Sequence, residues 1–208
     1  MIVLRRLIRE ICGLRSDSID DALSTAQLAH LGQTRKTGEA YIEHPKEVAR
    51  IVYSLYGDPV LCAAALLHDT LEDAVDQGNF ETIEELESMI GASFGDPNIA
   101  DEILRIVRKM THQKDTSYDS YVLSLLGDPA VLKIKLSDML HNLRSSPSPG
   151  QMNKYSKALQ ALQDASGGVP PGINQVHWNA LQNAASDDTL REGKLRAWIR
   201  KILKEARH

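Results

Sequence analysis

Four ionisable side chains lie at the end of one of the most apolar stretches of the chain. The stretch CAAALLHDTLEDA, residues 62–74, contains His68, Asp69, Glu72 and Asp73 directly after a run of alanine and leucine. Burying unpaired charge is costly, so either this end of the run is solvated or a cation lies there. Imidazole and carboxylate groups are ligands of first-row divalent metal ions, and a metal site is therefore one explanation of the pattern.

The spacing of these residues predicts which of them would bind the metal and which would act on a water. His68 and Glu72 are four residues apart, as are Asp69 and Asp73, so on a continuous helix each pair shares a face. His68 and Asp69 are adjacent, so their side chains leave the helix in different directions. Both can still bind one metal ion if the ion lies between the two side chains. The other two carboxylates follow one turn later, where they can act on a water that the metal activates.

Further metal ligands must come from other parts of the chain. His44 lies in YIEHPKEVA, and Asp138 lies in KIKLSDMLHNLRS with Asn142 four residues on. With His68 and Asp69 they make a set of two imidazoles and two carboxylates, which suits Mn, Fe, Co or Zn. For the other histidines we expect blander roles: packing or support at His30, a surface position at His112 and a structural role at His141. One metal ion is therefore expected.

The elements that must position these residues are helical. Val48, Ile51, Val52 and Leu55 recur at helical spacing, and no stretch alternates like a strand, so an all-α fold is predicted. Gly-Asp-Pro occurs at 57–59, 95–97 and 127–129. We expect each to mark a helix boundary, with glycine ending one helix, aspartate capping the next and proline in its first turn. His44-Pro45 is a similar start, with His44 at or just before the cap.

Turn-forming residues suggest two breaks in the second half of the chain. SSPSPG, residues 145–150, predicts a loop, and SGGVPPG, residues 166–172, predicts a linker. We therefore expect one domain at 1–165 and a helical extension at 166–208 packed on or next to it. The extension ends in an amphipathic basic helix that includes Lys194, Trp198 and Arg200, either a solvated face or a partner surface.

Composition narrows the class of protein. The 208 residues are 42% hydrophobic and 25% charged, and the net charge of −4 gives no sign of bulk binding to nucleic acid or acidic membranes. Cys12 and Cys62 are the only cysteines, which favours a reduced compartment. The longest apolar run, 60–67, is too short to span a bilayer, and charges interrupt the first residues where a signal peptide would be apolar. A cytoplasmic protein without nucleic-acid or membrane partners is expected, and its oligomeric state stays open.

Three stretches in order resemble a known family. AHLGQTRKTGEAYIEHPKEVARIV, AALLHDTLEDA and VLKIKLSDMLHNLR resemble the hydrolase domain of the RelA/SpoT alarmone enzymes, a branch of the HD-domain metal-dependent phosphohydrolases. The resemblance runs from about 19 to 155. It implies an HD-domain helical bundle, one divalent ion, usually Mn²⁺, and hydrolysis of guanosine 3′,5′-bis(diphosphate), ppGpp or pppGpp. That reaction releases pyrophosphate from the ribose 3′ position.

The resemblance also implies roles for single residues. It assigns the metal to His44, His68, Asp69 and Asp138. It assigns the positioning and deprotonation of the attacking water to Glu72 and Asp73. It places Arg35 and Lys36 against the nucleotide and Asn142 against the nucleoside. Cationic groups and a metal suit the negative charge of the departing pyrophosphate.

Departures from the family pattern leave the substrate open. The family motif commonly reads LADRLHNMRT, whereas this chain has LSDMLHNLRS, and the changes spare the implied ligands. The segment VRKMTHQKDTSYDSYV also resembles stand-alone HD proteins whose substrates are less settled. A phosphohydrolase acting on another nucleotide is the first alternative. A catalytically silent nucleotide-binding module is the second, and the intact set of acidic residues argues against it. Too little chain follows the linker for a synthetase domain, so hydrolysis alone is expected.

Overall fold

A computed structural model describes residues 17–73, 79–112 and 115–186 and confirms the all-α class. In these residues extended pairing is limited to one antiparallel bridge, between Thr34 and Ala40. The α-helices are α2 (Asp17–Ala29), α3 (Glu43–Tyr56), α4 (Pro59–Leu67), α5 (Thr70–Asp73), α6 (Ile83–Ala92), α7 (Pro97–Met110), α8 (Tyr118–Ser124), α9 (Pro129–Arg144), α10 (Pro149–Ser166) and α11 (Gln175–Ser186), with a 3₁₀ turn, η1, at Leu125–Gly127.

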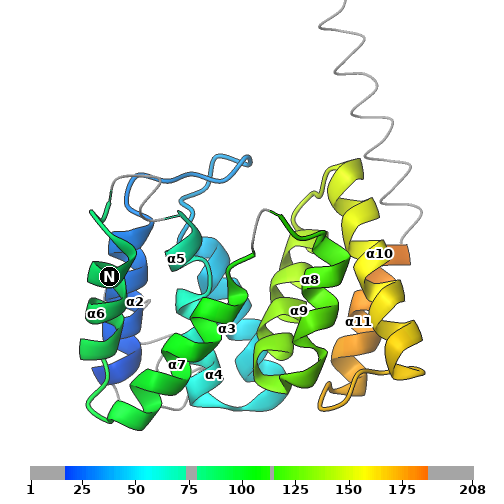
Figure 1. Cartoon of the computed structure of the whole chain (residues 1–208). Helices are drawn as coiled ribbons and strands as arrows, with labels where there is room; N and C mark the ends of the chain where they lie inside the picture. Colours follow the sequence, from blue (N-terminus) through cyan, green and yellow to red (C-terminus); the bar gives the residue numbers. More distant parts are fainter. Residues whose placement is uncertain (1–16, 74–78, 113–114, 187–208) are drawn as a thin grey trace, which may run out of the picture.

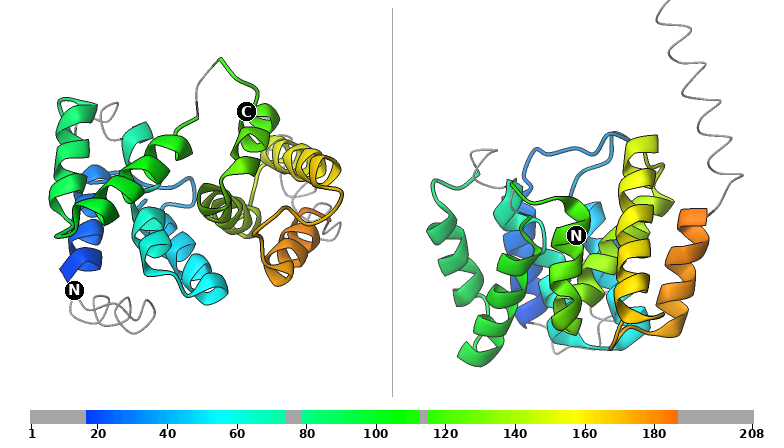
Figure 2. Two further views of the ribbon diagram at one scale, coloured as in Figure 1. Left: turned by 60° about the horizontal axis from the view of Figure 1, so that its bottom comes forward. Right: turned by 45° about the vertical axis from the view of Figure 1, so that its right-hand side comes forward.

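Helices α3, α4 and α9 lie in the middle of the bundle (Figure 1). Helix α4 packs against α3, α2 and α7, and α6 covers α7 on the outside. On the other side of α3 lies α9, which α11 contacts, while α10 pairs with α8; Figure 2 shows this group from two further directions. The core is continuous through these layers and includes Leu66, Ile106 and Leu136, each without exposed surface.

The three Gly-Asp-Pro segments begin helices as predicted. Asp58, Asp96 and Asp128 are the N-caps of α4, α7 and α9, and each side chain accepts hydrogen bonds from backbone N–H groups of the first turn. The following proline opens each helix. The role expected for glycine holds only at Gly57, which ends α3 in the left-handed conformation with φ 63°. The two other glycines have ordinary dihedral angles, because a 3₁₀ turn or a bend precedes the cap there.

Helix α3 begins earlier than the sequence predicted. Glu43 is its first residue and Ile42 precedes it without a side-chain cap, so His44 and Pro45 lie inside the first turn. Proline fits there because first-turn N–H groups have no partner within the helix. His44 therefore projects from the helix start and does not cap it.

The helix that carries His68 and Asp69 is not continuous. Helix α4 ends at Leu67, His68 and Asp69 form a turn, and α5 is a separate four-residue helix. The Thr70 hydroxyl donates to the Leu67 carbonyl over 2.7 Å, and His68 Nδ1 contacts the Ala65 carbonyl over 2.8 Å. These side chains satisfy carbonyls that a continuing helix would have bonded. The expectation of one continuous helix, on which His68 with Glu72 and Asp69 with Asp73 would each share a face, is therefore wrong.

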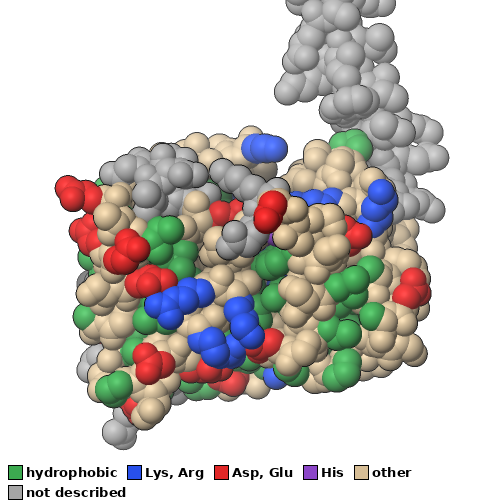
Figure 3. Space-filling model, in the orientation of Figure 1, with side chains coloured by type: hydrophobic (Ala, Val, Ile, Leu, Met, Phe, Trp, Pro, Cys, Tyr) green, Lys and Arg blue, Asp and Glu red, His purple; other side chains and the backbone are tan. Residues whose placement is uncertain are grey.

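The outer helices carry opposite charges side by side. Arg105 pairs with Glu102, and Arg108 on α7 pairs with Glu87 on α6. Figure 3 shows basic and acidic side chains interleaved on the face over α6 and α7. No helix of the described residues is long and apolar enough to cross a bilayer.

The C-terminal part agrees with the predicted loops. Residues 145–148 separate α9 from α10, whose Ser148 and Gln151 form a capping box, and Gly167 ends α10 in the left-handed conformation. Helix α11 follows the 167–174 connection and buries Trp178 against the bundle. The predicted last helix, with Lys194 and Trp198, lies outside the described residues, as does Cys12. The division at 165 and 166 stays a prediction.

Candidate metal centre

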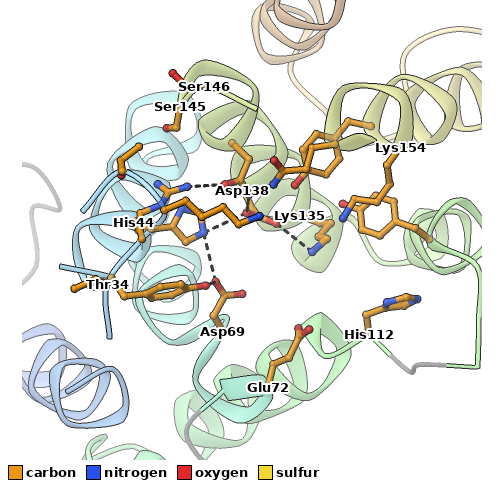
Figure 4. Close-up of a pocket in the computed structure, with 18 residues that line it drawn as sticks. Thr34, His44, Asp69, Glu72, His112, Lys135, Asp138, Ser145, Ser146 and Lys154 are labelled. Carbon is orange, nitrogen blue, oxygen red and sulfur yellow. Dashed lines mark hydrogen bonds and ion pairs between the residues drawn. The ribbon is translucent and has the colours of Figure 1, made fainter. Parts of the chain in front are cut away.

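Three parts of the chain bring the predicted metal ligands together, and Figure 4 shows His44 between Asp69 and Asp138. His44 comes from the start of α3, His68 and Asp69 from the turn between α4 and α5, and Asp138 from α9. Ligand atoms of His44, His68 and Asp69 all lie within 4.8 Å of one another. Asp138 borders this group, with its Oδ1 3.3 Å from His44 Nε2. Two imidazole nitrogens and two carboxylates thus face one small volume.

The proton position on His68 suits a metal ligand. Its Nδ1 lies 2.8 Å from the Ala65 carbonyl, which can only accept, so Nδ1 carries the proton and Nε2 keeps a lone pair. Nε2 is buried without a hydrogen-bond partner and lies 3.1 Å from Asp69 Oδ1. A divalent ion between these atoms would satisfy the nitrogen, and the donor set therefore fits such an ion.

His44 lies between two carboxylates. Its Nε2 is 3.4 Å from Asp69 Oδ2 and 3.3 Å from Asp138 Oδ1. Burial opposes the protonation of His44, but the hydrogen bonds to Asp138 and Asp69 outweigh burial and raise its pKa to about 9. Burial disfavours the Asp69 carboxylate, yet His68 and His44 hold its pKa well below the ordinary value. Without an ion, a proton on His44 supplies the positive charge that this group of acids requires.

Asp138 is held by two neighbours on its own helix. Its Oδ1 accepts a hydrogen bond from Asn142 Nδ2 over 2.5 Å, and its Oδ2 accepts one from Lys135 Nζ over 3.1 Å. Lys135 is almost fully buried, and its pKa is raised despite that burial because Asp138 lies beside it. Lys135 was not predicted as a site residue, although a lysine three residues before an acid on the same helix was a signal for it.

Tyr41, from outside the metal group, orients Asp69, and His30 packs behind Tyr41. The Tyr41 hydroxyl donates to Asp69 Oδ2 over 2.8 Å, and the Tyr41 ring packs against His30 at 4.7 Å between centroids. His30 is buried and is not among the clustered ligands, as expected. Tyr41 was not predicted, because its contact with Asp69 depends on the loop before α3.

His141 is closer to the site than its expected structural role suggested. Its Nδ1 lies 2.7 Å from His44 Nδ1 and accepts from Arg35 Nη1 over 3.2 Å, while its Nε2 lies 3.2 Å from Ser145 Oγ. Burial lowers the pKa of His141 to about 4, and His44 and Arg35 add to the effect. A neutral His141 that accepts at Nδ1 lets His44 donate there, and His44 Nε2 is then free for a ligand role.

A pocket of about 650 Å³ opens beside the metal group and gathers the other predicted residues. Arg35, Lys36, Glu72 and Asn142 all line it, and Arg35 Nη2 donates to Asn142 Oδ1 over 2.9 Å. His112 lines it too and is half-buried; its Nε2 contacts the Thr116 carbonyl at 2.7 Å. The side chain of Asp73 lies outside the described residues.

Comparison with known proteins agrees with this geometry. The HD domain family matches residues 22–163. The guanosine-3′,5′-bis(diphosphate) 3′-pyrophosphohydrolase of Haemophilus influenzae is 36% identical over 64% of this chain and 19% of its own length. The bifunctional (p)ppGpp synthase/hydrolase SpoT of Escherichia coli is 32% identical over 60% of this chain and 17% of its own.

Similar proteins also include three that are named as GTP pyrophosphokinases or as a GTP diphosphokinase. The GTP pyrophosphokinase of Streptomyces coelicolor is 33% identical over 77% of this chain and 18% of its own length. The chain spans 17% of the rice chloroplast protein named as a putative GTP diphosphokinase, and 20% of the probable GTP pyrophosphokinase of Mycobacterium leprae. The shared region is thus a small part of each relative. The match over most of the helical bundle, together with these relatives, shows that the chain belongs to the HD-domain family of phosphohydrolases, in its RelA/SpoT branch.

Proposed function

We propose that this chain hydrolyses guanosine 3′,5′-bis(diphosphate), ppGpp or pppGpp, with one divalent ion, Mn²⁺, held by His44, His68, Asp69 and Asp138. The observation that carries the proposal is the cluster of His44, His68 and Asp69, whose ligand atoms lie within 4.8 Å of one another beside a large pocket. When bound, such an ion supplies Lewis acidity and lowers the pKa of a coordinated water.

Residues of the chain would then have separate roles in the reaction. Glu72 lines the pocket one turn after Asp69, and it and Asp73 would orient the attacking water and accept its proton. The water oxygen bonds to the phosphorus attached to the ribose 3′ oxygen, and the bond between that phosphorus and the 3′ oxygen breaks. The 3′ oxygen takes a proton, and pyrophosphate leaves with one oxygen from water.

The nucleoside would bind at the Asn142 end of the pocket. Arg35 is already fixed there by hydrogen bonds to Asn142 and His141, so its guanidinium is preorganised. Lys36 lines the same pocket and adds a second cation. Relatives named as ppGpp hydrolases support the guanine nucleotide as substrate.

Matched variants test the catalytic assignment. Glu72→Gln and Asp73→Asn, made singly, should each lower the rate of pyrophosphate release from ppGpp by at least about a hundredfold, the usual range for an acid–base group. Mn²⁺ affinity and thermal stability should stay unchanged, since neither residue is a proposed ligand. Glu43→Gln, on the first turn of α3 outside the pocket, is the control. Full activity in both variants would show that neither Glu72 nor Asp73 orients or deprotonates the attacking water.

A panel of nucleotides tests the substrate. The proposal expects ppGpp and pppGpp to be hydrolysed in preference to GTP, ATP and nucleotides with only a 3′-monophosphate. If the chain hydrolysed another nucleotide but not ppGpp, it would still be a hydrolase, and that nucleotide would be its substrate. Tight Mn²⁺-dependent binding of ppGpp with no turnover would instead make the chain a binding module.

A further inference from the structure

A second basic region lies in the pocket, apart from Arg35 and Lys36. Lys135 Nζ lies 5.6 Å from the centre of the Tyr118 ring, and Lys154 Nζ lies 4.2 Å from the same centre. Lys154 also lies over Tyr155, at 5.0 Å. Figure 4 shows Lys135 and Lys154 pointing into the same part of the pocket, with Thr34 and His44 on its other side. Two ammonium groups from α9 and α10 thus face one ring.

Helix α9 sets the order of these groups along the pocket. Lys135, Asp138 and Asn142 are three and four residues apart, so they lie in line on one face of α9. Asn142 holds Arg35 at one end of this line, and Asp138 meets the metal group in the middle. Lys135 and Lys154 are therefore at the end away from the proposed nucleoside contact.

No acid of the described residues forms an ion pair with Lys154. None of the ion pairs in the described part of the chain includes it, and its contacts are with the faces of Tyr118 and Tyr155. Desolvation and the nearby Lys135 both lower the pKa of Lys154, and the two cations repel each other over the Tyr118 ring. An anion placed between them would relieve that repulsion.

We infer that Lys154, with Lys135 behind it, forms a subsite for the distal phosphate of the pyrophosphoryl group, across Asp138 from the nucleoside. The inference rests on the proposed function and makes it more specific. A nucleotide bound with its base near Asn142 and its reacting phosphorus at the metal group extends its second phosphate toward Lys154. The subsite favours a pyrophosphoryl group over a single phosphoryl group, because a monophosphate does not reach it.

Binding of inorganic anions tests the subsite without turnover. Pyrophosphate and phosphate are titrated into the full chain at one fixed concentration of free Mn²⁺, with wild type, Lys154→Gln and Lys157→Gln compared. Lys157 is an exposed lysine on the same helix that does not line the pocket, so its variant carries the same change of charge. Lys154→Gln should weaken pyrophosphate binding about tenfold, the loss of one charge-assisted hydrogen bond, and phosphate binding less than twofold. Lys157→Gln should change neither.

Several outcomes would overturn the subsite. These are failure of wild type to bind pyrophosphate, equal losses for both anions in Lys154→Gln, or a loss as large in Lys157→Gln. Lys154→Arg keeps the charge and should retain most of the affinity for pyrophosphate. A large loss of affinity in Lys154→Arg would mean that the shape of the side chain, and not its charge, determines binding. Since no nucleotide is present, this test can succeed even if ppGpp is not the substrate, and hydrolysis of ppGpp can be observed even if the subsite fails.

Discussion

At the scale of single residues, the site depends on which nitrogen of each imidazole carries a proton. The Ala65 carbonyl fixes the proton of His68 on Nδ1, and His141 offers His44 an acceptor for the same purpose. Both Nε2 atoms then face the carboxylates of Asp69 and Asp138. Backbone and neighbouring side chains thus prepare the ligands before any ion binds.

A variant of Tyr41 tests whether hydrogen bonds from neighbouring side chains prepare the site for an ion. Tyr41→Phe removes the 2.8 Å hydrogen bond to Asp69 Oδ2 and keeps the ring that packs on His30. We expect Mn²⁺ affinity, measured by calorimetry, to fall about tenfold, the lower end of the range for residues that orient ligands. Tyr53→Phe, outside the pocket on α3, should have no effect. Unchanged affinity in Tyr41→Phe would show that Asp69 needs no such support.

The sequence motifs contained the proposed ligands but not the residues that hold them. His44, His68, Asp69 and Asp138 stand out because acids and imidazoles interrupt apolar helical patterns. Tyr41 and His141 do not stand out, because their roles depend on contacts between the loop before α3, the α4–α5 turn, α3 and α9. Helical spacing tells which residues share a face of one helix, but not which helix lies opposite.

At the scale of elements, the start of α9 is fixed by charge as well as by its cap. Asp128 accepts from Val131 N and pairs with Arg105 and Lys109 of α7. Burial would raise the pKa of Asp128, but Arg105 and Lys109 outweigh it and lower the pKa to about 2. Because α9 also carries Asp138, the ion pairs of Asp128 with Arg105 and Lys109 fix the start of the helix that contributes to the site.

The lowered pKa gives a prediction with a definite sign. A carboxyl group whose folded pKa is below its unfolded value stabilises the fold above that unfolded value, about 4, and loses this contribution as pH falls toward 2. The free energy of unfolding of wild type should therefore fall more steeply between pH 4 and 2 than that of Asp128→Asn, which keeps the cap without the charge. Asp96→Asn is the control, because Asp96 also caps a helix but forms no ion pair among the described residues. Parallel pH profiles of wild type and Asp128→Asn would disprove the coupling.

A close approach of the 167–174 connection to α9 gives a second prediction at this scale. Gly172 has φ 76°, and a Cβ added there would lie 2.8 Å from Pro129 Cβ, at the first residue of α9. Gly172→Ala should lower the free energy of unfolding by more than about 1 kcal/mol, because both the dihedral angle and the contact are unfavourable. Gly150→Ala, in the first turn of α10 with its nearest neighbour at 4.0 Å, should be close to neutral in the same denaturant titration.

At the scale of the whole molecule, the question is whether α11 folds with the bundle. The family match ends at 163, yet Trp178 and Leu181 of α11 are buried, and Tyr56 of α3 contacts His177 over 2.8 Å. These contacts favour one cooperative unit that includes α11. The sequence predicted the helix and its linker from glycine and proline but could not tell how closely it would pack.

Leu181→Ala tests the cooperative unit. Loss of a fully buried leucine should lower the free energy of unfolding by about 3 kcal/mol, with a single transition seen both by helical signal and by tryptophan fluorescence. Val176→Ala, at a position 66% exposed on the same helix, is the matched control and should change little. Two separate transitions, or an unchanged midpoint in Leu181→Ala, would make α11 an independent extension.

The central claim is metal-dependent hydrolysis at the 3′ position, and product analysis tests it most directly. The full chain, freed of metal and then given Mn²⁺, is incubated with ppGpp in water enriched in oxygen-18. We predict GDP and pyrophosphate in equal amounts, the label in pyrophosphate, and no reaction before Mn²⁺ is added or in His68→Ala. Release of single phosphate, label in the nucleoside product, or equal turnover without metal would contradict the account.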